Sequence, residues 1–188
     1  AESHGANFAA ISHGKNRQAH FKARDITRED PASIFRDLGI SGSVDEQVDV
    51  LVGGPPCQAF ARVGRAKLRH EAHRREEDDA DIAFLVDGRV NLWQRYLHYV
   101  RETKPLALLM ENVPDILNHG GKNVAETVAE HLREEGYVVR YTLLNASWFG
   151  VPQTRERMFL IGIHESLDAD VVFPTPTHYT ALPAGYEG

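Results

Sequence analysis

The chain has 188 residues, 42% of them hydrophobic and 26% charged, which is typical of a globular domain that buries about 70% of its unfolded surface. No apolar run approaches the ~20 residues of a membrane span and no signal peptide opens the chain, so we expect a cytoplasmic protein without membrane contact. The single cysteine excludes an intrachain disulfide framework, and the net charge of −6 excludes a surface that coats nucleic acid throughout.

Two short elements are expected near the start of the chain. Phe21 to Ile26 is interpreted as a short strand. Asp30 and Pro31 then predict a helix start, because aspartate favours the N-cap and proline the first helical position. Gly39 is expected to end that helix.

The stretch from Val48 to Gln58 is the most informative part of the sequence. Val48 to Val52 predicts a short strand buried on both faces. Gly-Gly-Pro-Pro then predicts a stiff loop, which places Cys57 just past the carboxyl end of the strand. Ligands collect at that edge in open α/β sheets, so Cys57 is interpreted as a nucleophile. A buried structural thiol is the alternative.

The segment from Ala59 to Arg89 is highly charged. Its first half is basic, from Arg62 to Arg75, and its second half is acidic, from Glu76 to Asp81. A solvated loop explains the acidic half. Because the basic half directly follows the candidate nucleophile, we predict that it contacts phosphates.

Strands and helices alternate through the remaining chain. We predict helices from Asn91 to Lys104 and from Asn123 to Glu135, and strands at Leu106–Met110, Tyr137–Leu144 and Arg157–Ile163. Asn145 to Thr154 is expected to be loop, and the proline-rich segment after Phe173 to be extended. This alternation predicts the α/β class, with a doubly wound, mostly parallel sheet.

Several chemically active residues should meet at one sheet edge. Cys57 follows one predicted strand and Glu111 the next, and a right-handed crossover brings the carboxyl ends of such strands together. A carboxylate there is expected to be partly desolvated, which favours holding a proton; pairing with an arginine is the alternative. Arg155 and Arg157, two residues apart at a strand start, are expected to point to the same side.

Three blocks resemble the signatures of one family. Gly54-Pro55-Pro56-Cys57-Gln58, Glu111-Asn112-Val113 and Gln153-Thr154-Arg155-Glu156-Arg157 are similar, in content and order, to blocks of the C5-cytosine DNA methyltransferases. The resemblance implies a Rossmann-like fold that depends on S-adenosylmethionine, and double-stranded DNA as partner. It also implies a restriction–modification setting with a cognate endonuclease.

The resemblance also implies residue roles. Cys57 would be the nucleophile at cytosine C6, Glu111 the proton donor at N3, and Arg155 the contact to O2, supported by Arg157. Because C6 lies inside the base stack of duplex DNA, the cytosine would be flipped out. The implied cofactor-binding residues are Asp25, Ile26, Pro55 and Leu92, and the implied substrate-binding residues are Gln58, Asn112, Arg62 and Arg65.

The chain departs from the family pattern at both ends. It has no Phe-x-Gly-x-Gly block, the family's methionine-binding turn, and no target recognition domain. We therefore expect residues 1–178 to form a partial catalytic domain, inactive alone, with 179–188 beginning a connection to target recognition. Two alternatives stay open: a catalytically silent remnant that binds DNA or another partner, and an RNA cytosine-5 methyltransferase.

Overall fold

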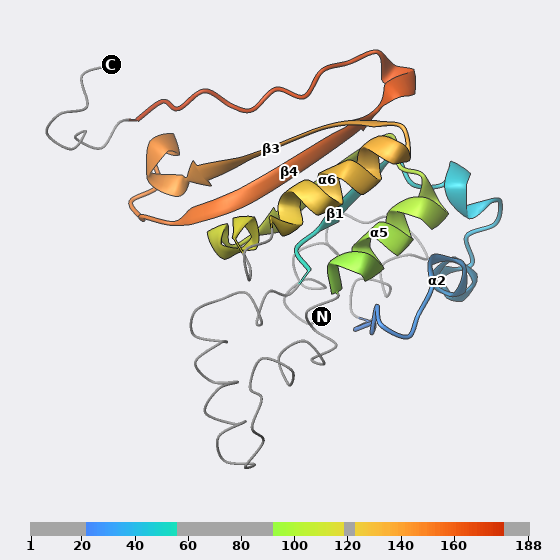
Figure 1. Ribbon diagram of the computed structural model, residues 1–188. Coiled ribbons are helices and arrows are strands. Elements are labelled where there is room, and N and C mark those ends of the chain that lie inside the picture. Colours follow the sequence, from blue (N-terminus) through green and yellow to red (C-terminus); the bar gives the residue numbers. More distant parts are fainter. Residues whose placement is uncertain (1–21, 56–91, 119–122, 179–188) are drawn as a thin grey trace, which may run out of the picture.

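The computed structural model describes residues 22–55, 92–118 and 123–178 (Figure 1). Within them, four strands form one sheet in the order β1-β2-β4-β3. The strands are β1 (Val50–Gly53), β2 (Ala107–Asn112), β3 (Tyr137–Asn145) and β4 (Glu156–His164). The α-helices are α2 (Pro31–Leu38), α5 (Leu92–Thr103) and α6 (Val124–Glu134). Short 3₁₀ turns are η2 (Val44–Glu46), η3 (Pro114–Leu117), η4 (Ala146–Phe149) and η5 (Glu165–Leu167).

Three of these strands run in one direction and β4 runs in the other. β1 pairs in parallel with β2, while β4 lies between β2 and β3 and is antiparallel to both. No helix crosses over between β3 and β4, and a strand pair joined without a crossover is antiparallel. The predicted α/β class with mostly parallel strands is confirmed. The reversed strand was not foreseen.

Helices α5 and α6 lie side by side against one face of the sheet (Figure 1). Leu108, Met110, Met158 and Leu160 point toward them and are at most 1% exposed. The burial of β1 on both faces was predicted wrongly. Val50 and Val52 remain 59% and 66% exposed, because the described helices cover only the face opposite to them.

Both predicted ends of α2, the end of α5 and the start of α6 are confirmed, while the predicted helix start at Asn91 lies outside the described residues. α2 begins at Pro31 and ends at Gly39, whose φ of 66° is the left-handed conformation that glycine adopts easily. α5 ends at Thr103, just before Lys104 and Pro105. Asn123 caps α6 by accepting a hydrogen bond from the Glu126 amide.

Three local predictions need correction. Residues 22–26 form no strand and pair with no strand among the described residues. Lys22 and Arg24 instead form ion pairs with Asp37 of α2, and the Ile26 carbonyl accepts from Arg95 of α5. Glu111 and Asn112 are the last two residues of β2 rather than the first after it, since their backbones pair with β4. The predicted loop after β3 includes the turn η4.

The segment after η5 is extended, as predicted, and runs back alongside β3 (Figure 1). Asp170 forms an ion pair with Arg140 of β3 at 3.3 Å, and Val171 is buried. The backbone amides of Thr177 and His178 both donate to the Trp148 carbonyl at 2.9 Å. Among the described helices, none is long and apolar enough to cross a membrane.

Candidate active site

β1 and β2 end at the same edge of the sheet and bring Glu111 beside the loop that leaves β1. Gly53 is opposite Met110, so Gly54 comes level with Glu111. A Cβ on Gly54 would lie 3.4 Å from Glu111 Oε2, so a larger side chain would crowd the carboxylate. Glycine keeps this space open. The predicted convergence of Cys57 with Glu111 stays a prediction, because Cys57 lies outside the described residues.

Asn112 holds the start of the Pro-Pro loop. Its Nδ2 donates to the Pro55 carbonyl at 3.3 Å, and its Oδ1 accepts from the Val113 amide at 2.8 Å. Asn112 and Pro55 are both buried. The amide therefore fixes where the loop departs, and contact of Asn112 with a substrate stays a prediction.

Glu111 faces two guanidinium groups, that of Arg157 in β4 and that of Arg155 just before this strand. Arg157 Nε lies 3.0 Å from Glu111 Oε1, and Arg155 Nη2 lies 4.0 Å from the same oxygen. The prediction that both arginines point to one side is confirmed. The Glu111 side chain is 37% exposed, and it does form the arginine pair weighed as the alternative.

The two arginines are held differently. Arg157 is 24% exposed, and its Nη1 also donates to the Glu156 carbonyl at 2.7 Å. The Arg155 side chain is 49% exposed, and its one contact within the described part of the chain is the long one to Glu111. Arg157 is thus fixed against the carboxylate, whereas the Arg155 guanidinium has room to turn toward a ligand.

A pocket of about 320 Å³ opens beside these three charged side chains. Phe149 and Phe159 supply aromatic wall, and the rest of the lining is Leu144, Asn145, Ala146 and Pro174. Small-molecule sites typically combine an apolar wall with a few polar groups and begin at about 300 Å³. This pocket suits a planar ring that has polar atoms along its edge.

Asn145 ties the turn between β3 and β4 to the start of β4. Its Oδ1 accepts from the Ser147 amide at 3.1 Å, the Ser147 hydroxyl at 2.9 Å and the Arg155 amide at 3.3 Å. The Ala146 amide donates to the Arg155 carbonyl at 2.9 Å. The backbone of Arg155 is therefore held on both sides at the rim of the pocket.

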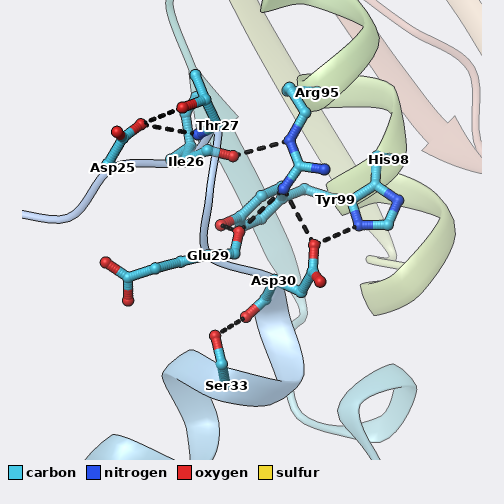
Figure 2. Close-up of polar contacts among 9 residues, drawn as sticks. All are labelled: Asp25, Ile26, Thr27, Glu29, Asp30, Ser33, Arg95, His98 and Tyr99. Atoms are coloured by element: carbon cyan, nitrogen blue, oxygen red, sulfur yellow. Dashed lines mark hydrogen bonds and ion pairs between the residues drawn. The ribbon is translucent and has the colours of Figure 1, made fainter.

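Asp25 and Ile26 lie on an exposed turn before α2 (Figure 2). Asp25 Oδ1 accepts from the Thr27 hydroxyl at 2.6 Å and from the Thr27 amide at 3.0 Å. These bonds, the hydroxyl first, hold the pKa of Asp25 below its usual value, so the carboxylate stays ionised at neutral pH. Ile26 is 36% exposed beside it.

Helix α5 lies between this turn and the end of β1. Arg95 bonds the Ile26 carbonyl at 2.8 Å, and Leu92 at the start of the helix is buried. One residue after Arg95, the Tyr96 hydroxyl donates to the Leu109 carbonyl at 3.2 Å. Burial raises the pKa of Tyr96, so the hydroxyl keeps its proton. The turn of Asp25 and Ile26 is thus bonded to the first turn of α5, which begins at Leu92.

The sequence profile of one family, described as C-5 cytosine-specific DNA methylase, matches residues 2–184. That is nearly the whole chain, and the same residues carry the three blocks quoted above. The chain belongs to this family.

Relatives of the family agree with this assignment. M.OihORF3336P of Oceanobacillus iheyensis, whose name places it among type II methyltransferases, is 37% identical over 155 residues, 82% of this chain and 31% of its own length. Type II methyltransferase M.AgeI of Thalassovita gelatinovora is 34% identical over 160 residues, 85% of this chain and 32% of its own. The chain therefore spans about a third of the length of these curated relatives.

A solved member of the same fold is the Dnmt2 methyltransferase of Schizosaccharomyces pombe. It superposes with a TM-score of 0.51 at 19% identity, covering 87% of this chain and 47% of its own. This likeness confirms the Rossmann-like methyltransferase fold.

The structure describes the predicted site residues in two places. Glu111, Arg155 and Arg157 line the pocket, and Asn112, next to Glu111, holds the Pro55 carbonyl. Asp25 and Ile26 lie on the turn bonded to α5, where Leu92 begins the helix. Four further predicted site residues lie outside the described residues: Cys57, Gln58, Arg62 and Arg65.

Sequence reasoning missed several residues at the methylase pocket. Asn145 carries a recognisable signal, because Asn-x-Ser after a strand favours a side-chain-stabilised turn. Phe159 also follows from the pattern, since it lies two residues after Arg157 on the same strand face. Phe149 and Pro174 carry no such signal, because only the path of the chain after β4 brings Pro174 to the pocket.

Proposed function

We propose that the protein is a DNA (cytosine-5)-methyltransferase that moves a methyl group from S-adenosylmethionine to C5 of a cytosine. The observation that carries this proposal is the contact of Glu111 with Arg155 and Arg157 in a ring-sized pocket. The pocket lies at the edge where β1 ends in the loop that leads to Cys57. Family membership supports the same reaction class.

Cys57 is the proposed nucleophile. Pro55 is anchored by Asn112, and Cys57 follows it by two residues, a length of chain that spans at most about 7 Å. The shortness of this tether supports attack by a Cys57 thiolate on a ring held against Glu111. The attack that it makes on C6 forms a carbon–sulfur bond and moves electron density to C5.

The covalent step balances through two protein groups. As the Cys57 thiolate adds to C6, a proton would pass from the Glu111 carboxyl group to N3, which leaves an enamine-like C5. S-adenosylmethionine would supply an electrophilic methyl on a sulfonium whose sulfur keeps the bonding electron pair. A water molecule would then take the C5 proton, which restores the C5–C6 double bond and expels the Cys57 thiolate, while N3 returns its proton to Glu111.

Arg155 and Arg157 differ in exposure and in their distance to Glu111, and these differences suit two different roles. Arg155, half-exposed and weakly held, would contact the cytosine O2 and orient the ring. Arg157, bonded to Glu111 at 3.0 Å, would keep the carboxylate aimed at N3. The aromatic rings of Phe149 and Phe159 offer apolar wall to a base that has left the stack.

Asp25, Ile26, Leu92 and Pro55 fit the adenosine part of S-adenosylmethionine. Asp25 is an ionised carboxylate, which accepts hydrogen bonds from hydroxyl or amino groups. Ile26 offers an exposed apolar surface next to it, and Leu92 and Pro55 are both buried. We propose that these four residues bind the cofactor.

We further propose double-stranded DNA as partner, with Gln58, Asn112, Arg62 and Arg65 among its contacts. The type II names of the relatives support a restriction–modification setting in the cytoplasm. Residues 1–178 would be the catalytic domain, and 179–188 would lead toward target recognition. We propose that methylation depends on the glycine-rich turn and target recognition domain found in longer members of the family.

The test uses the natural full-length protein and duplex DNA that carries 5-fluorocytosine at the target site. With S-adenosylmethionine present, we expect a covalent protein–DNA adduct that survives denaturation, because fluorine at C5 cannot leave as a proton does. Cys57→Ser should abolish the adduct. An adduct that persists in Cys57→Ser would place the nucleophile elsewhere, and absence of any adduct in the wild type would contradict the proposed reaction.

A further inference from the structure

Arg95, in the first turn of α5, reaches from the helix to the turn that contains Asp25 and Ile26 (Figure 2). Its Nε donates to the Ile26 carbonyl at 2.8 Å. Its Nη2 donates to the Glu29 carbonyl and to Asp30 Oδ1, each at 3.0 Å. The Arg95 guanidinium thus bonds three acceptor atoms within the five residues from Ile26 to Asp30.

Two further side chains on the same face of α5 hold the same segment (Figure 2). The Tyr99 hydroxyl donates to the Glu29 carbonyl at 2.7 Å. His98 Nε2 lies 3.0 Å from Asp30 Oδ1. Positions 95, 98 and 99 are three and four residues apart, so the helix presents them together.

Asp30 departs from the role that its sequence position predicts. It occupies the N-cap of α2, but its carboxylate makes no capping hydrogen bond. Both described contacts of Oδ1 are instead to α5, through Arg95 and His98. An N-cap aspartate is worth roughly 0.5–2 kcal/mol to a helix, so its use elsewhere indicates that the link to α5 matters more here.

Helix α5 is itself fixed to the end of β1. Tyr96 is 6% exposed, and its hydroxyl lies 3.5 Å from the Leu51 carbonyl of β1 and 3.2 Å from the Leu109 carbonyl of the neighbouring strand β2. A Cβ on Gly53 would lie 2.8 Å from the Tyr96 ring, which shows how closely the helix meets the strand. The position of the Asp25–Asp30 segment relative to the β1 end is therefore set through Arg95.

We infer that Arg95 is a positioning residue for cofactor binding. It holds the turn of Asp25 and Ile26 in place before the cofactor binds, so that the turn does not have to be ordered on binding. The inference rests on the proposed function, in which Asp25 and Ile26 bind S-adenosylmethionine. Ordering a loop on binding reduces affinity, and a loop that is already held avoids that cost.

The experiment compares the wild-type full-length protein with Arg95→Met, Arg95→Lys and Tyr99→Phe. Arg101→Met is the matched control, because Arg101 lies on the same helix and pairs with the exposed Glu135 at 2.8 Å. Hydrogen exchange without cofactor is measured over residues 25–30, where the amides of Arg28 and Glu29 bond the Asp25 carbonyl. The dissociation constant for S-adenosylmethionine and the kcat at saturating cofactor are measured alongside.

In Arg95→Met we expect faster exchange in the Asp25–Asp30 segment and a dissociation constant raised about tenfold or more, which corresponds to about 1.4 kcal/mol. The kcat at saturating cofactor should stay within about twofold, because only binding of the cofactor has changed. Arg95→Lys should resemble Arg95→Met, since one ammonium cannot reproduce the fork of the guanidinium. Tyr99→Phe should show a smaller effect of the same kind.

The outcomes separate the inference from the proposed function. Unchanged cofactor affinity in Arg95→Met, with or without faster exchange, would overturn the role of Arg95 while leaving the methyltransferase proposal intact. A fall in the kcat of Arg95→Met, with unchanged affinity for S-adenosylmethionine, would also overturn the role of Arg95 in cofactor binding. Failure of the wild type to bind S-adenosylmethionine would instead refute the proposed cofactor, and with it this inference.

Discussion

Arg157 Nε lies 3.0 Å from Glu111 Oε1, and the two residues come from adjacent antiparallel strands, β4 and β2. Glu111 is opposite Phe159, so Arg157, two residues earlier on β4, lies diagonally across from the carboxylate on the same sheet face. The strand register alone therefore aims the pair, and the reversed direction of β4 delivers Arg155 to the same carboxylate.

Glu111→Gln should lower methyl transfer by about 10²–10⁴-fold, the usual contribution of proton transfer by a positioned side chain. The fold should persist, because glutamine keeps the size of the side chain and an oxygen that accepts from Arg157. Steady-state transfer of tritiated methyl to DNA and the thermal unfolding midpoint measure the two effects. A loss smaller than about tenfold would assign Glu111 a structural role only.

Arg155 and Arg157 should respond differently to replacement by methionine. Arg155→Met should weaken turnover without moving the unfolding midpoint, because the Arg155 side chain is half-exposed and its one contact within the described residues is at 4.0 Å. Arg157→Met should lower both turnover and the midpoint, the latter by a few degrees, since a partly exposed ion pair contributes about 1 kcal/mol or less. A double-mutant cycle with Glu111→Gln should show coupling for Arg157 and little for Arg155. Equal coupling for both would mean that the arginines share one task.

The order and type of most elements could be predicted from local signals. Proline at position 31 and glycine at 39 marked the ends of α2, and Asn123 marked the start of α6. The ends of β2 could not be predicted, because Glu111 and Asn112 are polar and look like loop residues. Their backbones are nevertheless paired with Phe159 and Met158, and that pairing depends on the distant strand β4.

The sequence indicated how neighbouring residues of one motif are oriented. It did not indicate the contacts that distant segments make in the fold. That Arg155 and Arg157 share one side followed from their spacing, but their meeting with Glu111 depends on the reversed direction of β4, which was not foreseen. The contacts of Arg95 could not be foreseen, because they are made to carbonyls of residues 26 and 29, more than 60 positions away in the sequence. Apolar residues at helical spacing identify Tyr96 and Val100 as core. That spacing does not indicate which part of the chain the neighbouring Arg95 contacts.

The basic stretch after the proposed nucleophile should dominate the salt dependence of DNA binding. It lies outside the described residues, so this prediction rests on the sequence alone. Reversing the charge of Arg62, Arg65, Lys67 and Arg69 should reduce the log–log slope of affinity against salt by nearly one unit per lost phosphate contact. Changes in Glu76 to Asp81 provide the control and should leave the slope almost unchanged. If both halves gave the same slope, the stretch would not be a phosphate clamp.

Asp30 should contribute to stability at neutral pH and lose that contribution in acid. Hydrogen bonds from Arg95, then from His98, hold the pKa of Asp30 below its usual value, against a small opposing effect of desolvation. A carboxylate with a lowered folded-state pKa stabilises the fold fully above its unfolded pKa of about 3.9 and loses this as the pH falls through the folded value. The unfolding midpoints of the wild type and Asp30→Asn should therefore differ at pH 7 and converge below about pH 4. Asp49→Asn is the control, because Asp49 has no side-chain ion pair among the described residues. A difference between the midpoints of the wild type and Asp30→Asn that widened in acid would contradict the stabilising role of Asp30.

Asn145 should affect catalysis through the position of Arg155. Asn145→Ala removes the acceptor for the amides of Ser147 and Arg155 and for the Ser147 hydroxyl. Buried or partly buried donors left without a partner cost about 1–3 kcal/mol, so the turn at the pocket rim should shift. Methyl transfer should fall in Asn145→Ala and recover in Asn145→Asp, because aspartate presents the same acceptor oxygen.

Two comparisons decide whether this effect passes through Arg155 or reflects a general loss of stability. Ser147→Ala removes one of the three donors to Asn145 Oδ1 and should reduce methyl transfer less than Asn145→Ala does. Combining Asn145→Ala with Arg155→Met should cost less than the sum of the separate losses, because a displaced Arg155 has already lost its contact with the substrate. Strict additivity, or equal impairment by alanine and aspartate at position 145, would show that Asn145 supports the turn without setting the geometry of Arg155.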